Sequence, residues 1–326
     1  YCGMILSMAM AYCKVKKYKN ALDAIEKIKL PEQVRDERLK QVIKPLAASV
    51  SLYKVILKAA ENPKESARIF ASIDISFLKQ FGNNELISEI ASKFLPLLSI
   101  RDIAKEFLVG VFDIYKLTSN GSVEKLIDAS MQLGLKGSRD NIPLDNLIKL
   151  LPEVDIKEIL QAVIECQYFL ETNVSNAITC VTKAIELFYK KNLQDKASEK
   201  KLMFLLGDVN YKAGNSPQAK EAYKQAQNLG SPNRDFDCAW INWRLGLLSD
   251  KPEEAGTYFN NSGRVFIRLK VLDFVAKSYG EKSVTLVQQN KYEEYADVVF
   301  SILRRYYLKG EQLFGPTAMV VMAHVT

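Results

Sequence analysis

The sequence predicts an all-α protein built of short antiparallel helix pairs, and three observations support this prediction. Apolar residues recur at intervals of three and four, as in residues 159–164 and 185–189, which is the period of a helix with one buried face. Sustained alternation of apolar and polar residues, which is typical of β-strands, does not occur in the sequence. Helix breakers fall at intervals that suit short paired helices. These breakers are Pro31, Pro63, Pro96, Asn120–Ser122, Pro143, Pro152, Gly214, Pro232, Pro252 and Gly315–Pro316.

Composition favours a folded cytoplasmic protein. The chain has 326 residues, of which 48% are hydrophobic and 25% charged, and its net charge is +7. That excess is modest for the length and does not by itself indicate a nucleic-acid ligand. The five cysteines are scattered without a Cys-x-x-Cys pair, which fits reduced thiols in the cytoplasm better than a disulfide framework.

Neither end of the sequence has the pattern of a membrane anchor. The apolar residues 1–12 precede the basic run Lys14–Lys19, whereas a signal peptide has its positive charge first, and the run is too short to span a bilayer. The last residues, Ala318–Ala323, are also apolar, although complete helical arrays end in polar caps. We therefore expect no membrane partner, a truncated helix over 311–326, and a chain that is one piece of a longer polypeptide.

The segment Leu205–Ala226 contains the most specific pattern in the chain. Gly207 and Ala219 are small where two helices would cross, and Tyr223 would fill the space beside them. Gly214 lies where the chain must turn, and proline follows three residues later, in the first turn of the second helix. With Pro232 beyond it, this spacing resembles one tetratricopeptide (TPR) repeat, a helix pair of about 34 residues.

The resemblance implies an α-solenoid, a right-handed superhelix of antiparallel helix pairs in which each pair buries its apolar face against the next. It is strongest over 200–232, and it extends to residues 1–30, 158–190, 236–268 and 271–305. The expected organisation is a TPR-like hairpin (1–31), a diverged helical segment (32–155), a TPR-like array (156–310) and the apolar tail (311–326).

The middle segment lacks the small-residue crossings of the repeats. It still predicts helices, over residues 41–60, 85–98, 103–117 and 122–133. Two alternatives remain for it. These helices are either diverged hairpins of one continuous superhelix, or a separate segment that divides the first repeat from the array.

The resemblance also implies a binding groove, which the first helix of each TPR pair lines. The corresponding residues in the best repeat and in the next one are Lys201, Phe204, Asp208, Tyr211, Lys212, Trp240, Trp243 and Arg244. The two tryptophans, three residues apart, share one helix face, and aromatic and arginine side chains dominate binding hot spots. The alternative is that one or both tryptophans pack between neighbouring helices. Changing Trp240 and Arg244 to alanine would then unfold the protein instead of only weakening binding.

Some TPR proteins hold a partner's C-terminal carboxylate with a clamp of lysine and asparagine. Phe204 and Asp208 stand at two of the clamp positions here. We therefore do not expect recognition of chaperone C-terminal peptides.

Catalytic and cofactor motifs are lacking in the sequence. Its single histidine, His324, lies in the apolar tail, and no glycine-rich phosphate loop or calcium loop occurs. The pairs Glu253–Glu254 and Glu293–Glu294 point in different directions on a helix and suit the first turn of a second helix instead. We expect no enzymatic activity, no cofactor and no metal.

The expected partner is a peptide or protein ligand, or another domain of the same longer chain. Similar repeat arrays often follow the nucleotide-binding core of bacterial signal-transduction ATPases, so a sensor role is one interpretation. The alternative is a nucleic-acid-binding repeat protein. It is based on basic residues interleaved with tyrosines at Lys14–Lys19 and Arg304–Tyr307.

Overall fold

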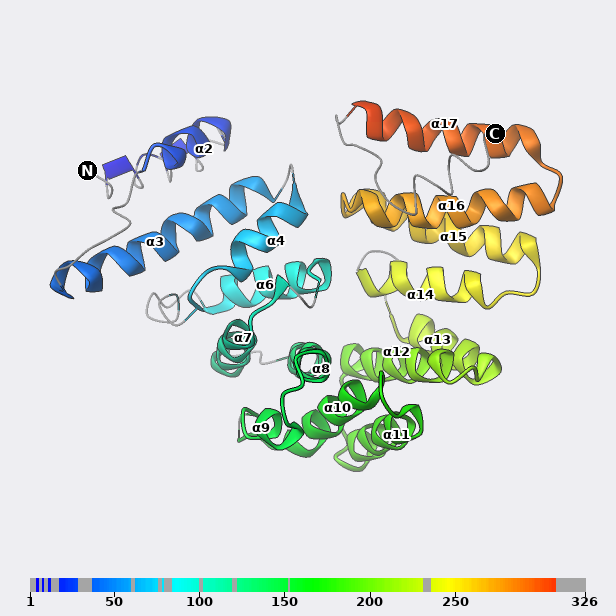
Figure 1. Cartoon of the computed structure of the whole chain (residues 1–326), viewed down its shortest axis with the longest axis horizontal. Helices are drawn as coiled ribbons and strands as arrows, with labels where there is room; N and C mark the ends of the chain where they lie inside the picture. Colours follow the sequence, from blue (N-terminus) through cyan, green and yellow to red (C-terminus); the bar gives the residue numbers. More distant parts are fainter. Residues whose placement is uncertain are drawn as a thin grey trace. The chain divides into compact units, whose positions relative to one another are not determined.

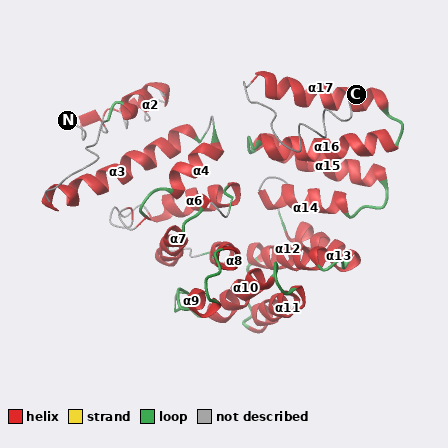
Figure 2. Cartoon of the chain, viewed as in Figure 1, coloured by secondary structure: helices red, strands yellow, loops and turns green. Residues whose placement is uncertain are grey.

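The computed structural model describes the greater part of the chain, and the part it describes is helical. The described residues are 4–5, 8, 11–12, 18–28, 37–59, 62–75, 78, 84–99, 102–118, 122–151, 153–230 and 236–308. Within these ranges the regular elements are helices, and none is a strand (Figure 2). The all-α prediction is therefore confirmed. The chain divides into two compact units, Tyr1–Tyr168 and Phe169–Thr326.

The first unit is a succession of helices, and from α2 to α9 each described helix packs on the next described one along the chain (Figure 1). Its elements are α2 (Tyr18–Glu26), α3 (Glu37–Lys58), α4 (Pro63–Ala71), α6 (Asn84–Phe94), the 3-10 turn η1 (Leu95–Leu97), α7 (Lys105–Leu117), α8 (Val123–Arg139), α9 (Leu144–Ile148) and α10 (Lys157–Phe169). The four helices expected between residues 41 and 133 correspond to α3, α6 with η1, α7 and α8. Pro63, one of the breakers in the sequence, begins α4, where the missing N–H of proline costs no helical hydrogen bond.

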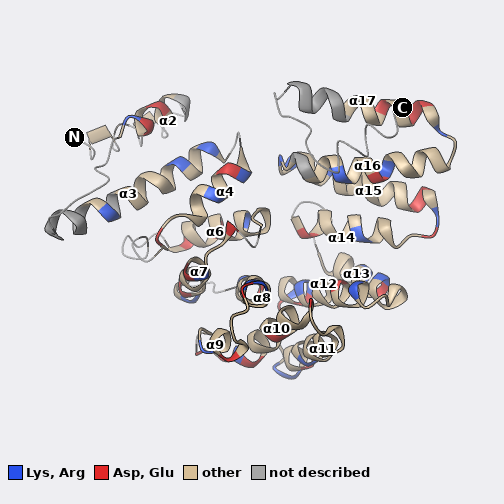
Figure 3. Ribbon diagram, in the orientation of Figure 1, with Lys and Arg blue, Asp and Glu red and all other residues tan. Residues whose placement is uncertain are grey.

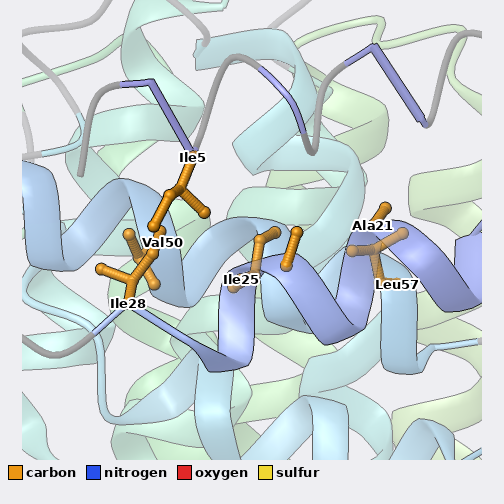
Figure 4. Close-up of a cluster of buried hydrophobic side chains, with 7 residues drawn as sticks. Ile5, Ala21, Ile25, Ile28, Val50 and Leu57 are labelled. Carbon is orange, nitrogen blue, oxygen red and sulfur yellow. The ribbon is translucent and has the colours of Figure 1, made fainter. Parts of the chain in front are cut away.

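Apolar side chains join the helices of the first unit in local clusters. Figure 4 shows one in which Ala21, Ile25 and Ile28 of the α2 region meet Val50 and Leu57 of α3. Another cluster is aromatic: the ring of Phe70 in α4 lies 6.4 Å from that of Phe94 in α6 and 5.3 Å from that of Phe107 in α7. Each cluster connects helices that follow one another in sequence.

The second unit repeats one arrangement, a helix followed by an antiparallel partner (Figure 1). Its helices are α11 (Val174–Lys190), α12 (Lys196–Lys212), α13 (Ser216–Leu229), α14 (Phe236–Leu247), α15 (Pro252–Arg268), α16 (Leu272–Gln288) and α17 (Tyr292–Leu308). The closest packing joins α12 to α13, α14 to α15 and α15 to α16. This unit is thus a stack of helix pairs, and the predicted helical repeat architecture is confirmed.

Four of the connections between helices of the second unit have the same backbone turn, which we call the corner. Each turns on one residue in the left-handed backbone region, at Asn192, Gly214, Lys270 and Asn290, with φ of 52°, 77°, 57° and 57°. The residue after each corner donates its N–H to the carbonyl oxygen five residues earlier. This is the long hydrogen bond of a Schellman motif, which ends one helix and redirects the chain into the next.

The division into units does not follow the predicted domain boundaries at residues 31, 155 and 310. The boundary between the two units in the sequence lies between residues 168 and 169. The helix α10, which was expected to be the first helix of the array, therefore belongs almost wholly to the first unit. Those boundaries remain predictions, and the apolar tail 311–326 lies outside the described residues.

Charged residues of both signs occur along the helices of the second unit. Basic and acidic residues are interspersed along α12 to α16 (Figure 3). No helix in the described part of the chain has a stretch long and apolar enough to cross a membrane.

Replacing Asn173 with alanine is expected to lower the free energy of unfolding by about 1 kcal/mol. Asn173 caps α11, and its side-chain oxygen accepts a hydrogen bond from the backbone N–H of Asn176 at 3.1 Å. Alanine leaves this N–H without its partner in the protein. Urea denaturation followed by circular dichroism measures the loss. Asn173→Ser keeps a capping oxygen and is the control; an equal loss in both variants would contradict the capping role.

Candidate functional site

The candidate site lies on the first helices of three successive pairs, α12, α14 and α16. Glycines let each first helix approach its partner closely. A Cβ atom built on Gly207 of α12 would lie 2.6 Å from the ring of Tyr223 in α13, and one on Gly246 of α14 would lie 2.5 Å from the ring of Phe259 in α15. The predicted contact of Gly207 with Tyr223 is thus present, and it recurs one pair later.

Arg244 of α14 is the centre of this site. Its Nε donates a hydrogen bond to Oδ1 of Asp208 in α12 at 3.2 Å. The guanidinium carbon lies 4.3 Å from the centre of the Tyr211 ring, 5.3 Å from that of Trp240 and 5.2 Å from that of Trp243. These contacts are cation–π interactions, and together with the ion pair they fix the guanidinium between two helices.

Asp208 is held from a second side by Tyr223, whose hydroxyl donates a hydrogen bond of 2.5 Å to the same oxygen. Burial raises the pKa of Asp208, while the charge of Arg244 and the hydrogen bonds from Tyr223 and Arg244 lower it. Burial, together with the charge of the neighbouring carboxylate, also raises the pKa of the Tyr223 hydroxyl. Tyr223 therefore stays protonated and serves as a donor to the carboxylate.

Lys277 of α16 contributes a second cation to the same rings. Its Nζ lies 4.1 Å from the ring centre of Trp243 and 5.5 Å from that of Trp240. The side chain is exposed to solvent. Partial desolvation and then the charge of Arg244 lower the pKa of Lys277, and Glu281 opposes this shift. Two cations thus face one aromatic surface closely enough to repel each other.

The aromatic side chains of the site form a continuous cluster from α14 to α16. Trp240 stacks on Phe236 at 6.2 Å and meets the edge of Phe274 at 5.6 Å between ring centres. Trp240 and Trp243 lie 5.0 Å apart. This packing fixes the two indoles, so the surface under the cations is preformed.

The structure brings five of the predicted site residues together and separates three. The five are Asp208, Tyr211, Trp240, Trp243 and Arg244, as the contacts above show. Lys201 is buried and forms an ion pair with Asp237 of α14, and Phe204 is 8% exposed against Tyr223. Lys212 forms an ion pair of 2.5 Å with Glu171, which precedes α11.

The two tryptophans differ in role. Trp243 is 7% exposed and packs against Ala255 and Phe259 of α15. Its indole Nε1 has no hydrogen-bond partner among the described residues. Trp240 is half-buried and borders the solvent. The alternative of packing between helices therefore describes Trp243, and Trp240 is the indole that a ligand can reach.

Lys277 and Phe274 were not among the predicted site residues, although the sequence holds a signal for them. Trp240 and Trp243 stand six and three residues before Gly246, and Phe274 and Lys277 stand six and three residues before Gly280. Aligning the glycines of successive first helices would have placed both residues on the same face.

The basic clusters that suggested nucleic-acid binding cannot be located relative to the site. The side chains of Lys14–Lys19 and Arg304–Tyr307 lie outside the described residues, as does His324.

Comparison of the sequence with known proteins does not assign this chain to a protein family. No protein-family model matches the sequence, and no curated protein sequence matches it. Solved structures do match, among them the crystal structure of a Rap protein complexed with competence and sporulation factor. That structure shares 10% sequence identity at a TM-score of 0.44, over 95% of this chain and 77% of the other.

Proposed function

We propose that this chain is a non-catalytic, TPR-like interaction module that binds a peptide or protein segment across α12, α14 and α16. The observation that carries the proposal is the convergence of Trp240, Arg244 and Lys277 on one surface drawn from successive helix pairs. Only the Nε of Arg244 is hydrogen-bonded within the described residues, so its terminal nitrogens remain available as donors. Rigid aromatic and guanidinium groups of this kind lose little entropy when a partner binds.

The preformed geometry favours binding over catalysis. Arg244 and Asp208 neutralise each other, and Tyr223 holds the carboxylate by a hydrogen bond that also fixes the hydroxyl. A general base or nucleophile needs a group free to take up a proton or to attack. Asp208 and Tyr223 instead hold Arg244 in place, which suits recognition of a partner's polar group.

Replacing Trp240 with alanine is expected to weaken peptide binding at least about tenfold, because the half-buried indole is the accessible part of the aromatic surface. Peptides are selected from a displayed random library on the full chain, and their affinities are then measured by titration calorimetry. Circular dichroism checks that helicity is kept.

Phe300→Ala is the matched control. Phe300 is an aromatic residue of α17 that is 69% exposed, and it does not belong to the site. Selected peptides should bind this variant as they bind the unaltered chain. Equal affinity for the unaltered chain and the Trp240 variant would show that the peptides bind elsewhere and would refute the proposed site.

A further inference from the structure

Two cationic groups of the candidate site have N–H donors that no described residue accepts, although Nε of Arg244 is paired with Asp208. The terminal nitrogens of Arg244 have no hydrogen-bond acceptor among the described residues. The ammonium of Lys277 contacts the two indole rings and forms no ion pair with a described residue. Both groups lie over Trp240, at 5.3 and 5.5 Å from its ring centre. Both cations therefore border the same indole ring.

The nearby acidic side chains either have hydrogen-bond or ion-pair partners already or are less readily ionised. Asp208 accepts from Tyr223 and from Nε of Arg244, and Asp237 is paired with Lys201. Glu281 attracts Lys277, but burial raises the pKa of this carboxyl group and so disfavours its charged form. None of these three acids is hydrogen-bonded to the outer nitrogens of Arg244 in the described residues. The site thus offers donors for one more anionic acceptor.

We propose that the bound segment is acidic and that the carboxylate of one Asp or Glu side chain lies between Arg244 and Lys277. This inference rests on the proposed function, because it names the chemistry of the partner at the same site. A carboxylate has two oxygens, so it can accept from the guanidinium and the ammonium together. It would also offset the repulsion between the two cations; after desolvation, the charge of Arg244 is the second cause that lowers the pKa of Lys277.

Other partner chemistries fit this surface less well. A cationic side chain would meet Arg244 and Lys277, which already cover the tryptophan rings. An uncharged apolar side chain would desolvate both cations without compensation. Trp240 and Arg244 lie on the middle one of the three helices of the site, so a bound chain can extend over α12 on one side and over α16 on the other. We therefore assign a side-chain carboxylate and not a chain terminus.

Replacing Lys277 with methionine is expected to reduce the preference for acidic peptides, because Arg244 then holds the carboxylate alone. The probes are the peptides selected on the full chain. Each is resynthesised with Glu and Asp changed to Gln and Asn, and separately with an amidated C-terminus. On the unaltered chain the uncharged versions should bind about tenfold more weakly, which is the effect of losing a charge-assisted hydrogen bond. On Lys277→Met this loss on neutralisation should shrink to about threefold or less, because one of the two donors is gone.

Lys251→Met is the matched control. Lys251 is an exposed lysine before α15 and lies outside the site, so this variant removes the same charge and should keep the acidic preference. Lys277 is preferred to Arg244 for the test because its side chain is exposed and holds no ion pair in the described residues.

The outcomes separate the two proposals. Peptides that depend on Trp240 but show no loss on neutralisation would overturn the acidic partner and leave the proposed function standing. Peptides that weaken only on C-terminal amidation would overturn the side-chain assignment. If no peptide binds in a manner that depends on Trp240, both proposals fail.

Discussion

Replacing Gly207 with valine is expected to lower the free energy of unfolding by about 3 kcal/mol, the upper part of the range for overpacked cores. The Tyr223 ring already lies 2.6 Å from the position of a Cβ atom on this residue. The ring cannot simply withdraw, because Tyr223 is fully buried and its hydroxyl is hydrogen-bonded to Asp208. Valine must therefore push α12 and α13 apart. Urea denaturation followed by circular dichroism measures the change.

Gly230→Ala is the control for this glycine. A Cβ atom there meets only the end of the Lys200 side chain, at 3.1 Å, and the residue has an ordinary extended backbone. Only the flexible end of this buried lysine must shift, by a few tenths of an ångström, so the expected loss in unfolding free energy is about 1 kcal/mol or less. If both variants lowered the free energy of unfolding equally, the close approach of α12 and α13 at Gly207 would not be the cause of the loss.

Replacing Arg244 with methionine is expected to lower the free energy of unfolding by about 2–3 kcal/mol. Breaking a buried ion pair costs about 3–5 kcal/mol, because one charge is left uncompensated. The side chains of Arg244 and Asp208 are each 19% exposed, so solvent screening reduces that cost. Thermal and urea denaturation of the variant measure it. The double variant Asp208→Asn with Arg244→Met leaves no isolated charge and should recover most of the loss.

The destabilisation by Arg244→Met should depend on pH. Arg244 opposes the rise that burial causes in the pKa of Asp208, so this pKa rises further in the variant. A carboxyl group with a raised pKa in the folded state favours folding at low pH, and this contribution is lost as pH rises through the folded-state value. The difference from the unaltered chain should therefore shrink as the solution is acidified. A pH-independent difference, or no recovery in the double variant, would contradict the assigned role of the pair.

The close crossings were predictable because they depend on local sequence. Gly207, Ala219 and Tyr223 stand at spacings that identify which residues meet when two adjacent helices pack. The left-handed corner at Gly214 was similarly visible, since glycine has no penalty there. The corner at Lys270 was not, because lysine carries no preference for that conformation and adopts it under the constraint of the flanking helices.

The site was predictable only in part because it depends on contacts between different helix pairs. The helical period shows that Lys201 and Trp240 lie on the first helices, but not which of them the next helix covers. Lys201 is covered by α14 and neutralised by Asp237, whereas Trp240 borders the solvent. Lys277 shares the site through the stacking of α16 on its neighbours, and the repeat pattern is weakest in this part of the sequence.

The packing of each helix on the next has a consequence for how the second unit unfolds. Contacts between neighbours make the stability of a helical stack a sum of local and nearest-neighbour contributions, so such a stack can open from one end. The side-chain bridges from α12 to α14 and from α14 to α16 add links across the pairs. A ligand held by Trp240, Arg244 and Lys277 would fasten these pairs together. Binding should therefore be visible as increased cooperativity, with three pairs melting as one block and their amides exchanging hydrogen at a common rate.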